Sequence, residues 1–327
     1  MDKKTNIIKD INLNKVRNAL KGMEAATKPQ LAKKTELSVV TINSLVNTLI
    51  EDGEIIPHAT LESEGGRPAA TFVYNNKFRL ALVIYMLEYH GEDTAFYCVV
   101  DLCGQVIEKI EQKLVNISIG SFDDNIEKLV NKYPQIKVIC FGVPGGEVNQ
   151  CLVISDYENL RGKSLSGYIH EKHHLPVLVE NDINAAVVGY SHRNNIDASQ
   201  CVIGLYFPEK YPPGAGIYLN GNIFKGRNGL AGEIKYLPFG IHWDSFDYNT
   251  KEVDDFIVKT IQAFQCTFNP NVIVLYGEKT GNYAQRIHEK CDTSVAKMMI
   301  PEIVASGDLN EDFETGIKLI ALKMIEN

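Results

Sequence analysis

The hydrophobic pattern of the 327-residue chain changes near residue 78. Before that point, apolar residues recur every three or four positions, which is the spacing of amphipathic helices. Beyond it, apolar runs of strand length alternate with helical segments, which indicates an α/β fold. We therefore expect an N-terminal helical domain over residues 1–77 and a larger α/β body. We divide the body into two lobes, 78–190 and 191–327, with a C-terminal helix that can return to the first lobe.

The sign of the net charge also differs between the two parts. The chain as a whole carries −8, but the first 79 residues carry +3 and the remainder −11. A basic segment on an acidic body suits a small module that binds a phosphate-bearing polymer. The composition, 45% hydrophobic and 23% charged, is typical of a soluble globular protein.

The cellular setting follows from what the sequence does not contain. It has no apolar stretch of membrane-spanning length and no secretory signal at its start, so we expect a cytoplasmic protein without a membrane partner. Its seven cysteines are scattered and never spaced as C-x-x-C. We expect reduced thiols and no cysteine zinc site.

Three helical segments follow one another in the N-terminal domain. The second has Thr27 as its cap and Pro29 in its first turn, and the third is expected over Val39–Glu51 after a Ser38 cap. A short helix, a turn and a longer helix form a helix-turn-helix. Two strand-like runs around the turn at residues 63–68 then predict a wing, so this domain is expected to be a winged helix-turn-helix.

The outward face of the third helix carries small polar residues that suit a DNA major groove. We expect the following side chains to reach base edges and thymine methyl groups: Val39, Val40, Thr41, Asn43, Ser44 and Asn47. Lys33 is expected to contact phosphate, or else to serve only solubility. Arg67, between Gly66 and a proline at the wing tip, is expected to enter a minor groove or touch phosphate. The alternative for this segment is a three-helix scaffold for protein contacts.

Six segments occur in an order that resembles the ROK family of repressors and sugar kinases. They are GGRPAATFVYN (65–75), FGVPGGEV (141–148), YENLRGKSL (157–165), VENDINAA (179–186), NGNIFKGRNGLAGEI (220–234) and NPNVIVLYG (269–277). The resemblance spans nearly the whole chain, and its wing tip points to the regulator branch. It implies an actin-like ATPase body, which is the ribonuclease H-like, sugar-kinase type of α/β fold.

The resemblance also implies where an effector binds. In the family, the aspartate of the Asn-Asp motif is the base that deprotonates a sugar hydroxyl, and Asp182 occupies that position. The ligand contacts carried over from the motifs are Gly145, Asn159, Asn181, Asp182 and Glu233. The alternative is that Asn181 and Asp182 only cap the helix that begins there.

The chain departs from the family pattern where ATP and zinc would bind. Bulky or acidic residues occupy the first phosphate turn (87–95), and the second contains Glu209 and two prolines, which lack amide donors. Tyr236 stands where the family has a zinc-binding histidine. We therefore expect no ATP, no zinc and no phosphoryl transfer. His242 and Trp243 either rebuild part of the pocket, or Trp243 packs a shortened connection.

These features together predict a DNA-binding transcription regulator, most simply a repressor, of carbohydrate-related genes. It would bind a double-stranded DNA operator as a homodimer or tetramer and respond to a sugar or sugar derivative. One alternative is an ATP-dependent sugar kinase with an accessory DNA-binding head. Another is a dimeric DNA-binding scaffold that has lost its ligand.

Overall fold

The computed structural model describes most of the chain. The described residues are 3–61, 69–155, 157–208, 211–241, 243, 251–277, 285–286, 289, 297–306 and 309–326. They fall into two compact units: Met1–Arg79 with Asp101–Cys103 form unit 1, and Leu80–Val100 with Gly104–Asn327 form unit 2. Among the described helices, none combines the length and the apolar character needed to cross a membrane.

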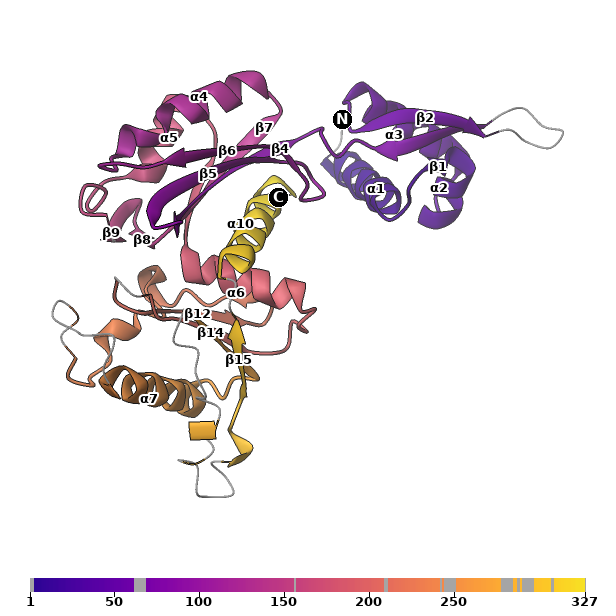
Figure 1. Cartoon of the computed structure of the whole chain (residues 1–327). Coiled ribbons are helices and arrows are strands. Elements are labelled where there is room, and N and C mark those ends of the chain that lie inside the picture. Colours follow the sequence, from indigo (N-terminus) through magenta and orange to yellow (C-terminus); the bar gives the residue numbers. More distant parts are fainter. Residues whose placement is uncertain are drawn as a thin grey trace. The chain divides into compact units, whose positions relative to one another are not determined.

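Unit 1 packs three helices against a small antiparallel sheet (Figure 1). Its elements are α1 (Lys3–Lys21), β1 (Ala26–Thr27), α2 (Lys28–Thr35), α3 (Val39–Glu51), β2 (Ile55–Leu61) and β3 (Ala69–Tyr74). The strands are ordered β1-β3-β2. One apolar cluster joins all three helices to β2 and β3, with Val16, Leu31 and Ile42 fully buried.

Polar side chains set the helix boundaries of unit 1. Thr27 and Gln30 form a reciprocal capping box at the start of α2. The Ser38 hydroxyl accepts a hydrogen bond of 3.1 Å from the Thr41 amide at the start of α3. α3 therefore begins and ends where the sequence predicts, because the caps that fix its first turn are local.

Unit 2 contains two sheets, and the first belongs to lobe 1. Its strands are β4 (Leu80–Tyr89), β5 (Glu92–Val100), β6 (Val106–Lys113), β7 (Ile136–Val143) and β10 (Val177–Asn181), in the order β10-β7-β4-β5-β6. β4, β5 and β6 pair antiparallel, whereas β7 and β10 are parallel to β4. Helices α4 (Asp123–Lys132) and α5 (Leu165–His173) cover one face, and α10 (Leu309–Glu326) covers the other (Figure 1). A short hairpin, β8 (Gly145–Val148) and β9 (Cys151–Ser155), follows β7.

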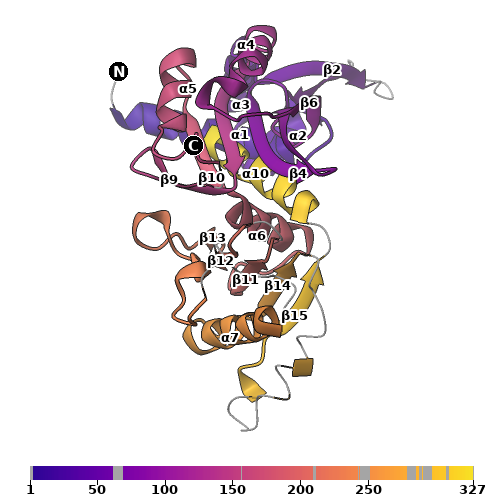
Figure 2. The same ribbon diagram turned by 60° about the vertical axis from the view of Figure 1, so that its left-hand side comes forward.

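The second sheet belongs to lobe 2. Its strands are β11 (Val202–Tyr206), β12 (Gly214–Leu219), β13 (Asn222–Ile223), β14 (Val272–Tyr276) and β15 (Glu302–Ser306), in the order β13-β12-β11-β14-β15. Helix α6 (Asp182–Arg193) covers one face and α7 (Lys251–Thr267) the other (Figure 2). Two short 3-10 turns, Arg227–Gly229 and Ile234–Tyr236, lie between β13 and α7.

Helices α6 and α10 cross with their backbones in contact. A Cβ atom on Gly189 would lie 1.9 Å from the carbonyl oxygen of Asp312. A Cβ atom on Gly316 would lie 1.7 Å from the carbonyl oxygen of Ala185. Both positions therefore require glycine, because backbone atoms cannot move aside as a flexible side chain can.

Candidate functional site

Asp182 lines a cavity of ≈ 250 Å³ in unit 2. The cavity walls come from the carboxyl ends of strands in both sheets, including Glu88 near the end of β4, Pro144 after β7 and Phe207 after β11. The N-terminal end of α10 adds Leu309, Asn310 and Phe313. In open α/β sheets, ligands bind in the crevice outside the carboxyl ends of the strands. The fold thus places Asp182 where a small polar ligand would be expected.

Asn159 lies in a neighbouring cavity of ≈ 230 Å³. Asp93 and Tyr157 line both cavities, and the Tyr157 hydroxyl donates a hydrogen bond of 3.0 Å to Asp93 Oδ1. Asn159 itself is exposed. Asp93 and Tyr157 therefore connect the cavity of Asn159 to the cavity of Asp182.

Asn181 and Gly145 are brought together directly. The Asn181 amide nitrogen Nδ2 donates a hydrogen bond of 3.0 Å to the Gly145 carbonyl oxygen. Its Oδ1 accepts one of 3.2 Å from the Asn184 amide, which caps α6. Gly145 has φ 139°, a backbone conformation that favours glycine. Both ends of the Asn181 side chain are thus bonded to the protein framework.

Glu180, the residue before Asn181, is a buried carboxylate that the sequence interpretation missed. It is 4% exposed, and Lys225 Nζ lies 2.7 Å from its Oε2. Its Oε1 accepts hydrogen bonds of 3.1 Å from the Asn181 amide and from Asn184 Nδ2. Lys225 therefore ties the segment after β13 to the end of β10. The signal in the sequence is the glutamate within an apolar strand, since a buried carboxylate needs a partner.

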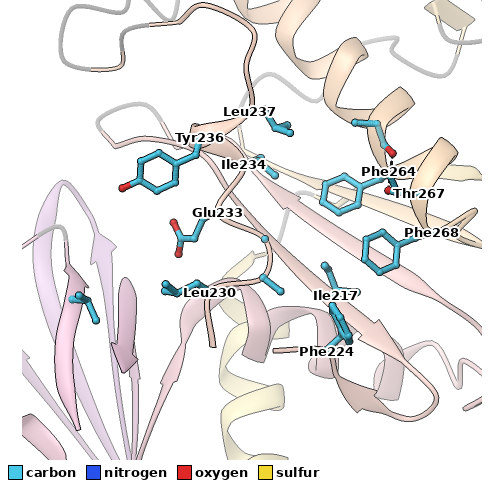
Figure 3. A pocket seen from close by; sticks show the side chains of 14 residues that line it. Ile217, Phe224, Leu230, Glu233, Ile234, Tyr236, Leu237, Phe264, Thr267 and Phe268 are labelled. Carbon is cyan, nitrogen blue, oxygen red and sulfur yellow. Dashed lines mark hydrogen bonds between the residues drawn. The ribbon is translucent and has the colours of Figure 1, made fainter. Parts of the chain in front are cut away.

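Glu233 lies apart from Asp182, in an apolar groove of ≈ 710 Å³ (Figure 3). Phe264 of α7 and Phe268, directly after this helix, form one wall. The Glu233 carboxylate pairs with Lys235 Nζ at 3.1 Å. Tyr236, which stands at the position of the family's histidine, is 74% exposed. Within the described part of the chain, no three metal-ligating side chains of the His, Cys, Asp or Glu type converge.

Trp243 packs between the 3-10 turn Ile234–Tyr236 and α7. Its Nε1 donates a hydrogen bond of 2.8 Å to the Lys235 carbonyl oxygen, and its ring meets Phe256 edge to face at 4.9 Å. This is the packing role that the sequence leaves open for Trp243. His242 lies outside the described residues.

The turns at the two expected phosphate positions are short or proline-rich. The β4–β5 ladder continues to the pair Tyr89 and Glu92, and the two turn residues, His90 and Gly91, have φ of 52° and 81°. These positive values are typical of a tight type I′ hairpin turn rather than of a loop that wraps a phosphate. In the second turn, Pro212 and Pro213 lack amide donors, and Glu209 lies outside the described residues.

In unit 1, α3 separates a buried face from an exposed face. Ile42, Leu45, Val46 and Leu49 are buried. The predicted contact residues Val39, Val40, Asn43, Ser44 and Asn47 are exposed, as is Lys33 on α2. Thr41 is half-buried, and its hydroxyl lies 2.8 Å from the Ser38 hydroxyl within the cap. Arg67 lies outside the described residues.

The amino-acid sequence of this chain is similar to that of known repressors. The xylose repressor of Bacillus spizizenii is 26% identical over 226 residues, which cover 64% of this chain and 56% of the repressor. The chain thus spans little more than half the length of that relative.

Two solved structures share the fold. A ROK family transcriptional regulator, a homologue of the E. coli MLC protein, superposes with a TM-score of 0.63 at 19% identity, over 96% of this chain and 97% of the regulator. The ROK hexokinase of Thermus thermophilus gives 0.55 at 16% identity, over 76% of this chain and 99% of the hexokinase. Unit 2 therefore has the actin-like fold of ROK sugar kinases.

The sequence profile of the ROK family matches residues 90–241. This range contains Gly145, Asn159, Asn181, Asp182 and Glu233, the residues expected to contact an effector. Residues 90–241 are therefore a ROK family domain, and the chain is a homologue of the xylose repressors and of the Escherichia coli regulator NagC.

Proposed function

We propose that this protein is a DNA-binding transcription regulator, most simply a repressor, of carbohydrate-related genes. Unit 1 is the DNA-binding domain, a winged helix-turn-helix with α3 as the recognition helix. The observation that carries the proposal is α3 itself: a capped helix whose apolar residues are buried and whose exposed side chains, Asn43, Ser44 and Asn47, are small and polar. Such a face fits a major groove and hydrogen-bonds base edges.

Charge and strand geometry support the same assignment. The first 79 residues carry +3 against −11 for the remainder, so DNA phosphates are attracted to unit 1 and repelled by unit 2. β2 and β3 pair antiparallel next to α3 in the chain, as the strands of a wing do. The relatives named as repressors point the same way.

Unit 2 is, in this proposal, the effector-binding part. A sugar or sugar derivative would occupy the cavity beside Asp182, where carboxylate and tyrosine side chains offer partners for hydroxyl groups. Because the xylose repressors are relatives, pentoses are the first ligands to test. Binding would change the separation of the two α3 helices in a dimer or tetramer that contacts two operator half-sites, about 34 Å apart or a multiple of that.

We further propose that unit 2 does not transfer phosphate and needs neither ATP nor zinc. The tight hairpin at His90 and Gly91 and the prolines at 212 and 213 support this, because both turns offer few free amides to a phosphate. Hydrolysis of ATP in the presence of a pentose or hexose would contradict this part of the proposal without touching the DNA-binding part.

The proposal is tested by recovering the DNA fragments that the full chain binds and measuring their affinity by gel shift. Asn43→Ala combined with Asn47→Ala should weaken binding about tenfold or more, since each lost base contact costs roughly 1–3 kcal/mol. The matched control is Asn131→Ala, because Asn131 is an exposed helical asparagine on α4 of unit 2. Equal binding by both variants would reject α3 as the recognition helix.

A further inference from the structure

Two adjacent valines stand exposed at the start of α3. Val39 is 51% exposed and Val40 is 79% exposed. The core of unit 1 is filled by other α3 residues, such as Ile42 and Leu49, so these valines are not needed for packing. Single exposed apolar residues are ordinary, but a neighbouring β-branched pair on the surface proposed to meet DNA calls for a partner.

The polar groups around these valines are already engaged within the helix cap. The Ser38 hydroxyl accepts a hydrogen bond from the Thr41 amide at 3.1 Å and lies 2.8 Å from the Thr41 hydroxyl. The side chains that flank the valines thus form their hydrogen bonds with each other. The first turn of α3 therefore presents an apolar tip. The carboxamides of Asn43 and Asn47 lie one and two helical turns further along α3.

Helical spacing places this apolar tip in line with the polar side chains. Val40, Asn43, Ser44 and Asn47 recur at three and four residues, so they share one stripe along α3. All four side chains on this stripe are exposed. In helix-turn-helix domains, the N-terminal residues of the recognition helix contact the base edges. Val40 would therefore lie at the end of the stripe that goes deepest into the groove.

We propose that Val39 and Val40 recognise the C5-methyl groups of thymine, so that each operator half-site places thymine beneath the first turn of α3. This inference rests on the proposed function. The thymine methyl is the apolar group that base pairs present in the major groove, and cytosine lacks it. Valine suits the contact because its branched side chain has few rotamers to lose on binding. Asn43 and Asn47 then recognise adenine through their carboxamides in the following base steps.

The test removes the methyl groups without changing base pairing. The full chain first selects a binding duplex from a random-sequence DNA pool. That duplex is then rebuilt with deoxyuridine in place of thymidine, one position at a time. We expect binding to weaken roughly three- to fivefold at one or two positions in each half-site, the effect of losing one buried methyl group. Substitution elsewhere in the duplex should have no effect.

Protein variants assign the effect to the valines. Val39→Ala with Val40→Ala should reduce the difference in affinity between the thymidine and deoxyuridine duplexes at the sensitive positions, because alanine retains only one methyl group for the contact. Val115→Ala is the matched control, because Val115 is 81% exposed but belongs to unit 2, and it should keep the full difference. Circular dichroism of each variant verifies that the domain remains folded.

The outcomes separate this inference from the proposed function. Failure to select any sequence from the pool would reject the DNA-binding function itself. Selection of a sequence that binds equally well with deoxyuridine throughout would reject the thymine-methyl contact and leave the DNA-binding function standing. A deoxyuridine effect that persists unchanged in the double valine variant would also reject the contact, because other residues would then be recognising the methyl groups.

Discussion

The Tyr276 hydroxyl donates a hydrogen bond of 2.9 Å to Oδ2 of Asp312, a carboxylate whose residue is fully buried. Arg193 donates one of 2.7 Å to the other carboxylate oxygen. Two residues further along α10, Glu314 accepts hydrogen bonds from Tyr85 and Lys109 of lobe 1. One turn of α10 therefore holds a strand of each sheet, β14 through Asp312 and β4 through Glu314.

We expect Asp312→Asn to lower the free energy of unfolding by about 2–3 kcal/mol, because it removes the charge that pairs with Arg193 and leaves a buried polar network incompletely satisfied. Urea unfolding measures this. Glu311→Gln is the control, since Glu311 contacts the same Arg193 but its side chain is 55% exposed, and its loss should cost less than about 1 kcal/mol. Equal losses in the two variants would contradict the special role of Asp312.

Gly316→Ala should destabilise unit 2 by about 3 kcal/mol or more, because the added Cβ atom would meet the Ala185 carbonyl oxygen. The sign is informative, since alanine is favoured over glycine by about 1 kcal/mol in an ordinary helix interior. Thermal unfolding measures the change. Gly146→Ala, with open space around the added atom, should have little effect. A stabilised Gly316→Ala protein would show that α6 and α10 can separate freely.

The acid stability of unit 2 should depend on Glu314. Burial alone would raise the pKa of Glu314, but hydrogen bonds from Tyr85 and Lys109 and the nearby Lys318 outweigh it and lower the pKa from 4.5 to about 2. A lowered pKa in the folded state stabilises the protein above the unfolded pKa. That stability is lost as pH falls from about 4.5 through about 2.

Glu314→Gln should therefore flatten the dependence of unfolding free energy on pH in that window, by roughly 2 kcal/mol once solvent screening is allowed for. Urea unfolding at a series of pH values between about 2 and 7 measures this effect. Glu127→Gln, an exposed substitution on α4, is the control and should leave the pH profile as in the parent protein. An unchanged profile in Glu314→Gln would mean that its hydrogen bonds do not favour the ionised form.

Asp182→Asn should abolish the response to the effector while basal DNA binding is kept. The substitution removes the carboxylate charge that faces the cavity, but an amide oxygen can still accept the hydrogen bond of 2.7 Å from the Ile183 amide. Titration calorimetry with a panel of pentoses and hexoses, paired with gel shifts, measures both properties. If Asp182→Asn unfolds unit 2 instead, Asp182 serves the start of α6 rather than a ligand.

The elements that follow from local chemistry are those that the sequence predicts well. The bounds of α3 follow from Ser38 and from the Asp52-Gly53 turn, and the buried strands β7 and β14 follow from continuous apolar runs. Which residues line the same cavity cannot be predicted from local chemistry in this way. Asp182 and Glu233 both match family motifs, yet they line different cavities: Asp182 begins α6 after β10, whereas Glu233 directly precedes the 3-10 turn Ile234–Tyr236.

Contacts between segments that are distant in the sequence could likewise not be predicted. Nothing local indicates that Lys225 pairs with Glu180, or that Gly189 and Gly316 meet, since each pair is joined only when the sheets and helices assemble. The β8–β9 hairpin also escaped prediction. Its strands have only four and five residues, too few to show a clear alternation of apolar and polar positions.

The glycine crossing of α6 and α10 restricts how the body can move. Shear motions between packed helices rely on side chains that slide past each other and exchange rotamers. At Gly189 and Gly316 no side chain lies between the two backbones, so carbonyl groups obstruct translation along the contact. Rotation about the crossing point is the motion that remains, which makes this contact a pivot. An effector in the cavity beside Asp182 would therefore act by changing an angle between the lobes and not by displacing one lobe along the other.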